Sequence, residues 1–154
     1  MTLHKPSLHL RYSQDFELDI ESSAQISYDG AAAPDWLSRI KCIIRHPTGR
    51  FLYEADRICF ARSDIERFST ELRNIRNGSS DQARLATPGE MFSFLLHLQN
   101  RQLKATIAVR EFQPENELTI LTAGFTVDYD LFINRLYDDV FAFARDLKDA
   151  ELPG

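Results

Sequence analysis

The stretch that decides the fold is residues 39–78, which reads RIKCIIRHPTGRFLYEADRICFARSDIERFSTELRNIRNG. Its first part alternates apolar and polar side chains on both sides of the turn sequence Pro47-Thr48-Gly49. Proline fixes φ and glycine accepts a positive φ, so this tripeptide favours a reversal of the chain. Because alternation with a period of two is typical of a strand with one buried face, we expect a β-hairpin with strands over residues 39–46 and 51–60.

The second part of the same stretch predicts an amphipathic helix. Ser63 and Glu66 have the S-x-x-E spacing of a capping box, with Ser63 as the N-cap. Asn77-Gly78 ends the segment with residues suited to the left-handed conformation. Between these signals the apolar side chains recur every three or four residues and share one helix face: Ile65, Phe68, Leu72 and Ile75.

Alternation continues on both sides of this stretch. Towards the N-terminus it predicts a hairpin whose strands, 8–12 and 16–20, are joined by residues 13–15. A small-residue loop is expected over residues 29–34. Towards the C-terminus the pattern predicts strands over residues 82–87, 92–99, 103–110 and 118–127, with breaks at Pro88-Gly89, Asn100-Arg101 and residues 113–116. These connections are too short for parallel crossovers and indicate an antiparallel meander.

A second helix is expected from Asp128, a suitable N-cap, to about Lys148. The predicted fold class is therefore α+β: a twisted antiparallel sheet of two meanders with two amphipathic helices packed on one face. We expect a single domain over residues 1–154, with an ordered core over about residues 7–148.

A faint internal repeat accompanies this pattern. Phe60 and Ser63 have the same spacing as Phe125 and Asp128, which would make each half a meander followed by a helix. In this alignment, however, Ile65 falls on Asp130, so the apolar stripes of the two helices do not superimpose. Since any strand that enters a capped amphipathic helix shows such spacings, we favour this ordinary explanation over a true repeat.

Composition and charge exclude several classes of function. The chain has 154 residues, 27% of them charged, and a net charge of −5. This balance argues against nucleic acid and against an anionic membrane surface as partners. No apolar run is long enough for a secretory leader or a membrane span. Cys42 and Cys59 are expected to be two buried thiols in a reducing cytoplasm.

The sequence contains no strong catalytic motif. Glycine-rich phosphate loops, nucleophile elbows and metal-ligand spacings are absent from it. We therefore predict no catalytic residue, no metal and no cofactor. His97, on an otherwise apolar strand, is the histidine of most interest, and a Cys42–His97 or Cys59–His97 dyad is conceivable. A half-exposed strand histidine and buried thiols are the favoured explanation.

Clustered acidic residues nominate a surface for binding a partner. Acids gather near the predicted N-terminal hairpin, on the strand 51–60 and on the last helix. An acidic patch would speed association with a basic protein and select it. The candidate partner-binding residues are Asp15, Glu17, Asp19, Glu21, Glu54, Asp56, Asp138 and Asp139.

Two segments carry a resemblance to a known family. The runs Phe60-x-x-Ser63-Asp64-Ile65-Glu66-x-Phe68-x-x-x-Leu72 and Phe125-Thr126-Val127-Asp128-Tyr129-Asp130-Leu131-Phe132-Ile133-x-x-Leu136 resemble the helix entries of small bacterial wall-associated-protein-type immunity proteins and related domains of unknown function. The resemblance covers about residues 38–147. The family opens its last helix with Asp-Gln, whereas this chain has Asp128-Tyr129. No functional residue is carried over, because the matching positions are caps and core.

The resemblance implies that the protein binds and neutralises a cognate toxin. Members of the family are encoded beside polymorphic toxins, and an acidic domain would suit a basic toxin. We therefore expect a non-catalytic interaction protein whose partner is a basic toxin. Two alternatives stay open at this point. One is a small-molecule-binding or enzymatic domain with a cleft near His97; the other is a structural module that dimerises through a strand edge.

Overall fold

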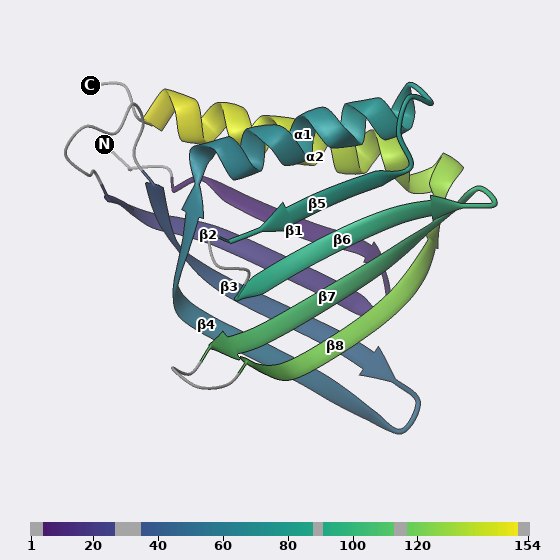
Figure 1. Ribbon diagram of the computed structural model, residues 1–154, viewed down its shortest axis with the longest axis horizontal. Helices are drawn as coiled ribbons and strands as arrows, with labels where there is room; N and C mark the ends of the chain where they lie inside the picture. Colours follow the sequence, from purple (N-terminus) through teal and green to yellow (C-terminus); the bar gives the residue numbers. More distant parts are fainter. Residues whose placement is uncertain (1–4, 27–34, 88–90, 113–116, 151–154) are drawn as a thin grey trace.

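A computed structural model describes residues 5–26, 35–87, 91–112 and 117–150 of the chain. Four strands are followed by a helix, and the same order is then repeated (Figure 1). The elements are β1 Ser7–Ser13, β2 Phe16–Ile26, β3 Asp35–His46, β4 Gly49–Ala61, α1 Arg62–Arg76, β5 Gln82–Ala86, β6 Phe92–Gln99, β7 Gln102–Phe112, β8 Glu117–Asp128 and α2 Tyr129–Ala150. The expected loop 29–34, the Pro88-Gly89 turn and the break at residues 113–116 lie outside the described residues.

The strands form two antiparallel sheets, which confirms the predicted α+β class with antiparallel meanders. One sheet has the order β1-β2-β3-β4 and the other β5-β6-β7-β8, with four strands in each. The hairpin at Pro47-Thr48 is present, with His46 paired to Gly49. The turn between β6 and β7 also lies where it was predicted, with Asn100 and Arg101 at φ values of 50° and 60°. Such tight turns match the twist of the flanking strands.

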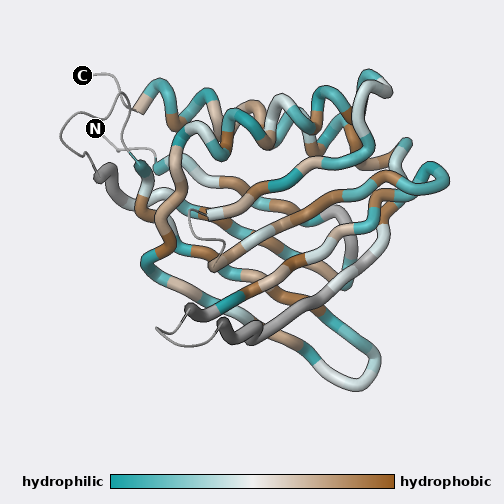
Figure 2. Tube along the Cα trace, viewed as in Figure 1, coloured by the Kyte–Doolittle hydropathy of each residue, from teal (hydrophilic) through white to brown (hydrophobic). Residues whose placement is uncertain are grey.

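The two sheets face each other across a shared core. The ring of Phe16 on β2 stacks against that of Phe94 on β6, with centroids 6.1 Å apart. Phe60 on β4 meets Phe92 on β6 edge to face at 6.3 Å. Figure 2 shows the alternation of hydrophobic and hydrophilic residues along the strands, which turns one face of each sheet towards this core. Buried residues of both sheets thus belong to one continuous core.

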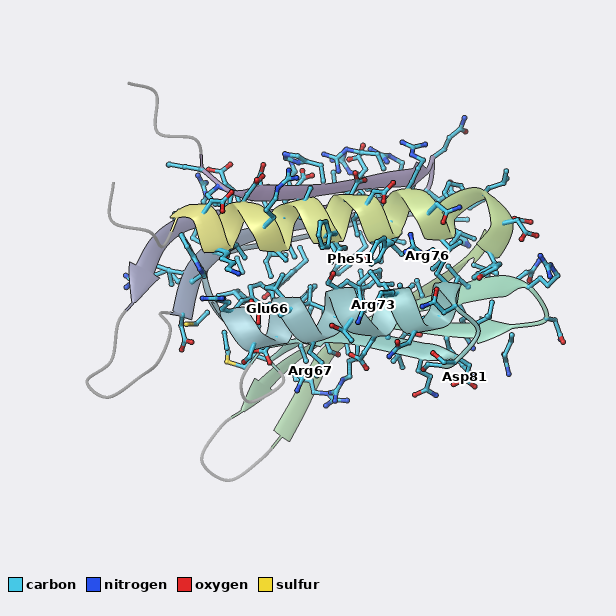
Figure 3. All side chains as sticks on the ribbon, turned by 90° about the horizontal axis from the view of Figure 1, so that it is seen from above. Phe51, Glu66, Arg67, Arg73, Arg76 and Asp81 are labelled. Carbon is cyan, nitrogen blue, oxygen red and sulfur yellow. The ribbon has the colours of Figure 1, made fainter. Side chains whose placement is uncertain are left out.

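The two helices run antiparallel, side by side, over the edge of the molecule where β1 and β5 lie (Figures 1 and 3). Each helix follows one sheet in the sequence but packs along the first strand of the other sheet. Helix α1 follows β4 and packs along β5, whereas α2 follows β8 and packs along β1. Phe68 extends the core from α1, because its ring contacts Phe94 at 6.0 Å. The helices thus couple the two halves of the chain.

The start of α1 differs from the prediction. The N-cap is Ala61 rather than Ser63, and Ser63 is an exposed residue inside the helix. Alanine has no oxygen with which to cap, so the stabilising contact comes from Asp64, whose Oδ2 accepts a hydrogen bond from the Ala61 amide at 3.3 Å. At α2 the predicted cap is confirmed, because Asp128 Oδ1 accepts from the Leu131 amide at 3.1 Å.

The structure also changes the interpretation of the internal repeat. Both halves are a four-stranded meander followed by a helix. The buried stripes of α1 and α2 do superimpose when 68 is added to each residue number of α1. This offset differs from the one that relates Phe60 to Phe125. The matching pairs are Ile65 and Ile133, Phe68 and Leu136, Leu72 and Val140, and Ile75 and Phe143. The two halves are therefore equivalent in architecture.

Candidate functional site

The predicted acidic residues of the first sheet come together on its outer face. Glu17, Asp19 and Glu21 lie on β2, and Glu54 and Asp56 on β4, with β3 between them. Asp15 sits in the turn before β2, where its carbonyl accepts a hydrogen bond from the Arg45 amide at 2.8 Å. Part of this face is a shallow depression of about 280 Å³ that includes four of these acids, namely Asp19, Glu21, Glu54 and Asp56.

Basic side chains neutralise this face. Asp19 is the centre of the network, with Arg11 Nη2 at 2.6 Å and His9 Nδ1 at 2.8 Å from its carboxylate. The other carboxylates each have a Lys or Arg within 4.0 Å: Glu17 with Arg11 and Arg45, Glu21 with Lys5, Glu54 with Lys41, and Asp56 with Arg39. Five carboxylates thus meet five Lys or Arg side chains, and the face is a mosaic of alternating charge rather than an acidic patch.

Asp138 and Asp139 do not belong to this face. Both are exposed residues of α2. Partial burial raises the pKa of the Asp139 carboxyl above its ordinary value. The eight acids nominated from the sequence therefore divide between a charge-balanced sheet face and a helix, and they form no single surface.

No Cys–His dyad forms among the described residues. Cys42 lies in the core, and burial raises the pKa of its thiol from 9.0 to about 12. Burial, together with the carboxylate of Asp35 at 4.0 Å from Sγ, also raises the pKa of Cys59. His97 instead faces Asp81, with 3.5 Å between Nε2 and Oδ2. Since the thiolate is the nucleophilic form of cysteine, neither thiol is prepared for attack.

The described residues also lack a metal site, since they hold no group of three or more His, Cys, Asp or Glu side chains able to bind a metal ion. Neither helix in this described part of the chain is both long and apolar enough to cross a membrane. The free cysteines, Cys42 and Cys59, are not bonded to each other.

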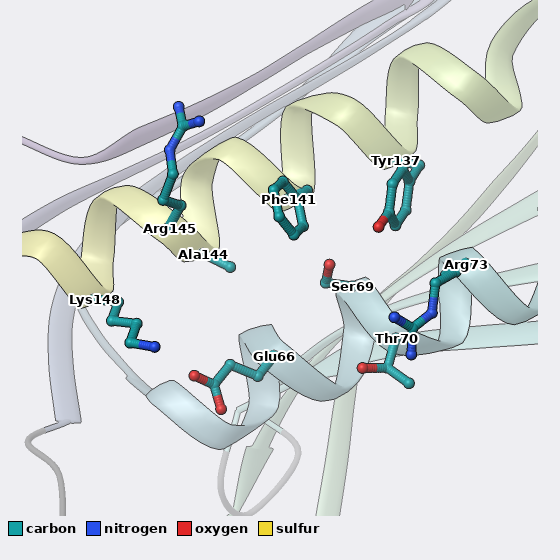
Figure 4. A pocket seen from close by; sticks show the side chains of 9 residues that line it. All are labelled: Glu66, Ser69, Thr70, Arg73, Tyr137, Phe141, Ala144, Arg145 and Lys148. Atoms are coloured by element: carbon teal, nitrogen blue, oxygen red, sulfur yellow. The ribbon is translucent and has the colours of Figure 1, made fainter.

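A groove between the two helices is the more distinctive surface. It has a volume of about 420 Å³ and opens on the side of the helices that faces away from the core (Figures 3 and 4). The first helix and the second each supply one wall. The lining residues are Glu66, Ser69, Thr70 and Arg73 from α1, and Tyr137, Phe141, Ala144, Arg145 and Lys148 from α2.

Aromatic side chains form the α2 wall. The buried stripe of α2 includes Val140, and the next residue, Phe141, turns by about 100° around the helix axis and leaves the core. Phe141 is 50% exposed and stacks on Tyr137 with ring centroids 5.8 Å apart. The guanidinium of Arg76 lies 4.0 Å from the centre of the Tyr137 ring, a favourable cation–π contact. This contact fixes Tyr137 against α1.

The groove carries unbalanced positive charge. Among the described residues that line it, the one acid is Glu66, which already pairs with Arg62 at 2.8 Å, and Arg145 lies 3.8 Å from Asp146. No described carboxylate lies within ion-pair distance of Arg73 or Lys148, which lie towards opposite ends of the groove (Figure 4). These two cations are therefore available to an external anion.

A serine hydroxyl points into the middle of the groove. Ser69 is only 8% exposed, and its side chain is directed towards the space beside Phe141 and Tyr137 (Figure 4). Because Ser69 lines the open groove, its hydroxyl can exchange hydrogen bonds with water or with a bound partner.

The groove was not among the surfaces predicted from the sequence. The last helix is acidic when its charges are counted along the chain, but the groove takes its cations from both helices. One signal was available, namely that Phe141 falls outside the apolar stripe of its helix. It stands four residues after Tyr137, a spacing that brings two aromatic side chains together on the helix surface.

Comparisons of the chain with protein-family models, with curated proteins and with solved structures find no match. The chemistry of its own surfaces therefore carries the functional argument.

Proposed function

We propose that this chain is a non-catalytic interaction protein that binds another protein through the groove between α1 and α2. The observation that carries the proposal is an exposed aromatic pair, Phe141 on Tyr137, beside cations with no described partner. Aromatic and Arg side chains are enriched where binding energy concentrates in protein interfaces. Covering Phe141 would remove its apolar surface from water, which favours association.

The charge mosaic of the first sheet supports this choice of surface. A basic partner seated on that face would first have to displace Lys or Arg side chains from Glu17, Asp19 and Glu54. Each displaced pair is weak on its own, but together they leave little net field to attract a basic protein. In the groove, by contrast, the positive charges of Arg73 and Lys148 are not paired with a described carboxylate.

The most concrete form of the proposal is an immunity protein that binds and neutralises a cognate bacterial toxin in the cytoplasm. The resemblance around Ser63 and Asp128 suggests this role, and the groove supplies a surface for it. Neutralisation by binding requires no reactive group on this protein, because it is sufficient to cover the toxin's active site or to block a conformational change that the toxin needs.

The test is protection in a bacterial host. The products of the genes on either side of the one for this chain are expressed singly, with and without the protein. We expect one product to arrest growth, the intact protein to restore growth, and the two purified proteins to form a complex by size-exclusion chromatography.

Matched variants of α2 connect that protection to the groove. Phe141→Ser removes the exposed aromatic side chain of the groove, whereas Leu131→Ser removes a side chain that is 70% exposed but is not part of the groove lining. We expect Phe141→Ser to lose protection and Leu131→Ser to keep it, with both variants equally stable. If no flanking product is bound, or if both variants protect equally, the proposal is wrong.

A further inference from the structure

We infer that the occupant of the groove is an acidic amphipathic helix of the partner, lying parallel to the axes of α1 and α2. This inference rests on the proposed function and specifies the chemistry of the partner. Amphipathic helices commonly lay an apolar face in a groove of this kind, with residues three or four apart as anchors. A third helix would complete a three-helix layer with α1 and α2.

The middle of the groove selects an apolar anchor. Phe141 and Ala144 lie on the same side of α2, three residues apart, and both face the groove (Figure 4). Across from them lies Ser69, whose hydroxyl faces the groove. An anchor such as leucine on the incoming helix would cover Phe141, and a neighbouring polar group would bond the Ser69 hydroxyl.

The ends of the groove select acidic residues at a defined spacing. Arg73 lies at the level of Tyr137, and Lys148 lies eleven residues further along α2 (Figure 4). At a rise of about 1.5 Å per residue, this interval corresponds to roughly 16 Å along the helix axis. A helix laid parallel to α2 has the same rise. Its carboxylates should therefore stand at positions i and i+11, which also share one face because eleven residues make about three turns.

The net charge of the chain opposes the binding of an acidic segment, so a preference of the groove for such a segment would come from its local cations. The protein as a whole carries −5 and would repel an acidic segment at long range. Binding of an acidic helix therefore depends on the local cations, Arg73 and Lys148, and an additional contribution from Arg145 at the rim. Reversing the charge of the first two should reverse the preference of the groove.

The experiment uses a set of synthetic helical peptides of 18 residues with a central leucine stripe. One peptide has Glu at its fourth and fifteenth positions, a second has Lys there, and a third carries its two Glu on the opposite face. Binding to the intact, ¹⁵N-labelled protein is followed by the amide chemical shifts, which report affinities as weak as millimolar. We expect the first peptide to shift the resonances of Ser69, Arg73, Phe141 and Ala144, and to bind about tenfold more tightly than the other two.

A charge-swapped protein provides the control for specificity. The double variant Arg73→Glu/Lys148→Glu should lose the acidic peptide and gain the Lys peptide. Because both residues lie in the last turn of their helices, where a negative charge opposes the helix dipole, we expect a modest loss of thermal stability, with the amide shifts of residues outside the groove unchanged. The inference is overturned if the acidic and basic peptides bind equally, if the acidic peptide does not bind up to millimolar concentration, or if the shifts fall outside the groove.

Two further outcomes identify other occupants and also overturn the inference. Groove resonances that shift with the protein's own concentration would identify a second copy of the chain. Preferential sedimentation with phosphatidylserine vesicles would identify a membrane surface. The failure of the inference and that of the proposed function stay distinguishable. If a flanking gene product needs Phe141 for binding but binds the charge-swapped variant as well as the intact protein, only the acidic-helix inference is wrong. If the peptide binds but no toxin is neutralised, only the immunity role is wrong.

Discussion

At the scale of single residues, the Cys42 thiol is the clearest case of a group whose chemistry the fold has changed. It is fully buried, and its pKa is raised from 9.0 to about 12. Above pH 9 the unfolded chain therefore releases a proton that the native protein retains. Because the unfolded state then binds fewer protons, the free energy of unfolding must fall as pH rises through this range, by up to about 1.4 kcal/mol per pH unit for this thiol.

The variant Cys42→Val tests this expectation, since valine is apolar, is larger by only one heavy atom and does not ionise. We expect urea unfolding between pH 8.5 and 10.5 to show a steeper loss of stability for the intact protein than for the variant. The native thiol should also react slowly with a thiol reagent at pH 8. Equal slopes in the two proteins would show that Cys42 ionises as readily in the native state as in the unfolded chain.

Single residues also show why counting acids along the chain does not locate a single acidic patch. The acids were read along the chain, but their neutralisation comes from across the sheet: Asp19 pairs with His9, which lies opposite it on β1, and Glu54 pairs with Lys41, which lies opposite it on β3. A count within a segment does not contain this pairing. The same reasoning explains the groove, because Arg73 and Phe141 are far apart in the sequence and become neighbours only when the helices pack.

At the scale of elements, the start of α1 shows how strand pairing can override a capping motif. Asp35 on β3 pairs with Ala61, so β4 keeps its strand conformation up to that residue. The helix begins directly afterwards, and Ser63 falls inside the first turn rather than before it. The pattern predicted the helix, its buried face and its end at Asn77-Gly78, but not this boundary, because the strand partner lies outside the local sequence.

Two substitutions in this turn have opposite expectations. Asp64→Ala should lower the free energy of unfolding by about 1 kcal/mol, because it removes the acceptor of the Ala61 amide and the partner of Arg67. Ser63→Ala, at the residue that the sequence motif nominates, should change it by less than about 0.5 kcal/mol. Denaturant unfolding monitored by circular dichroism measures both. A larger cost at Ser63 would place the functional cap there.

At the scale of the whole molecule, each helix packs along a strand from the other half of the chain. We therefore expect that neither half is stable alone. In a fragment of residues 1–80, α1 would lack β5, and β1 would lack α2. The aromatic contacts of Phe16, Phe60 and Phe68 would also be lost, since all three use rings on β6. A half-chain would expose an apolar face too large for its remaining core to compensate.

We expect the fragments 1–80 and 81–154 to be unfolded or aggregated when expressed singly, and to regain native-like circular dichroism when expressed together. Amide exchange in the full chain should show the strands of both sheets opening in one cooperative step. A fragment that folds alone with sharp, dispersed NMR signals would contradict this view of a shared core.

The match between the buried stripes of the two helices shows which residues occupy equivalent positions on the two walls of the groove. Applying the offset of 68 that superimposes the buried stripes places Ser69 on Tyr137 and Arg73 on Phe141, and all four residues line the groove. The two walls therefore occupy equivalent positions on their antiparallel helices, but their chemistry differs. One wall offers a small hydroxyl and a cation where the other offers two rings. A bound segment turned end for end would exchange these contacts, so the groove distinguishes the polarity of the chain that it receives.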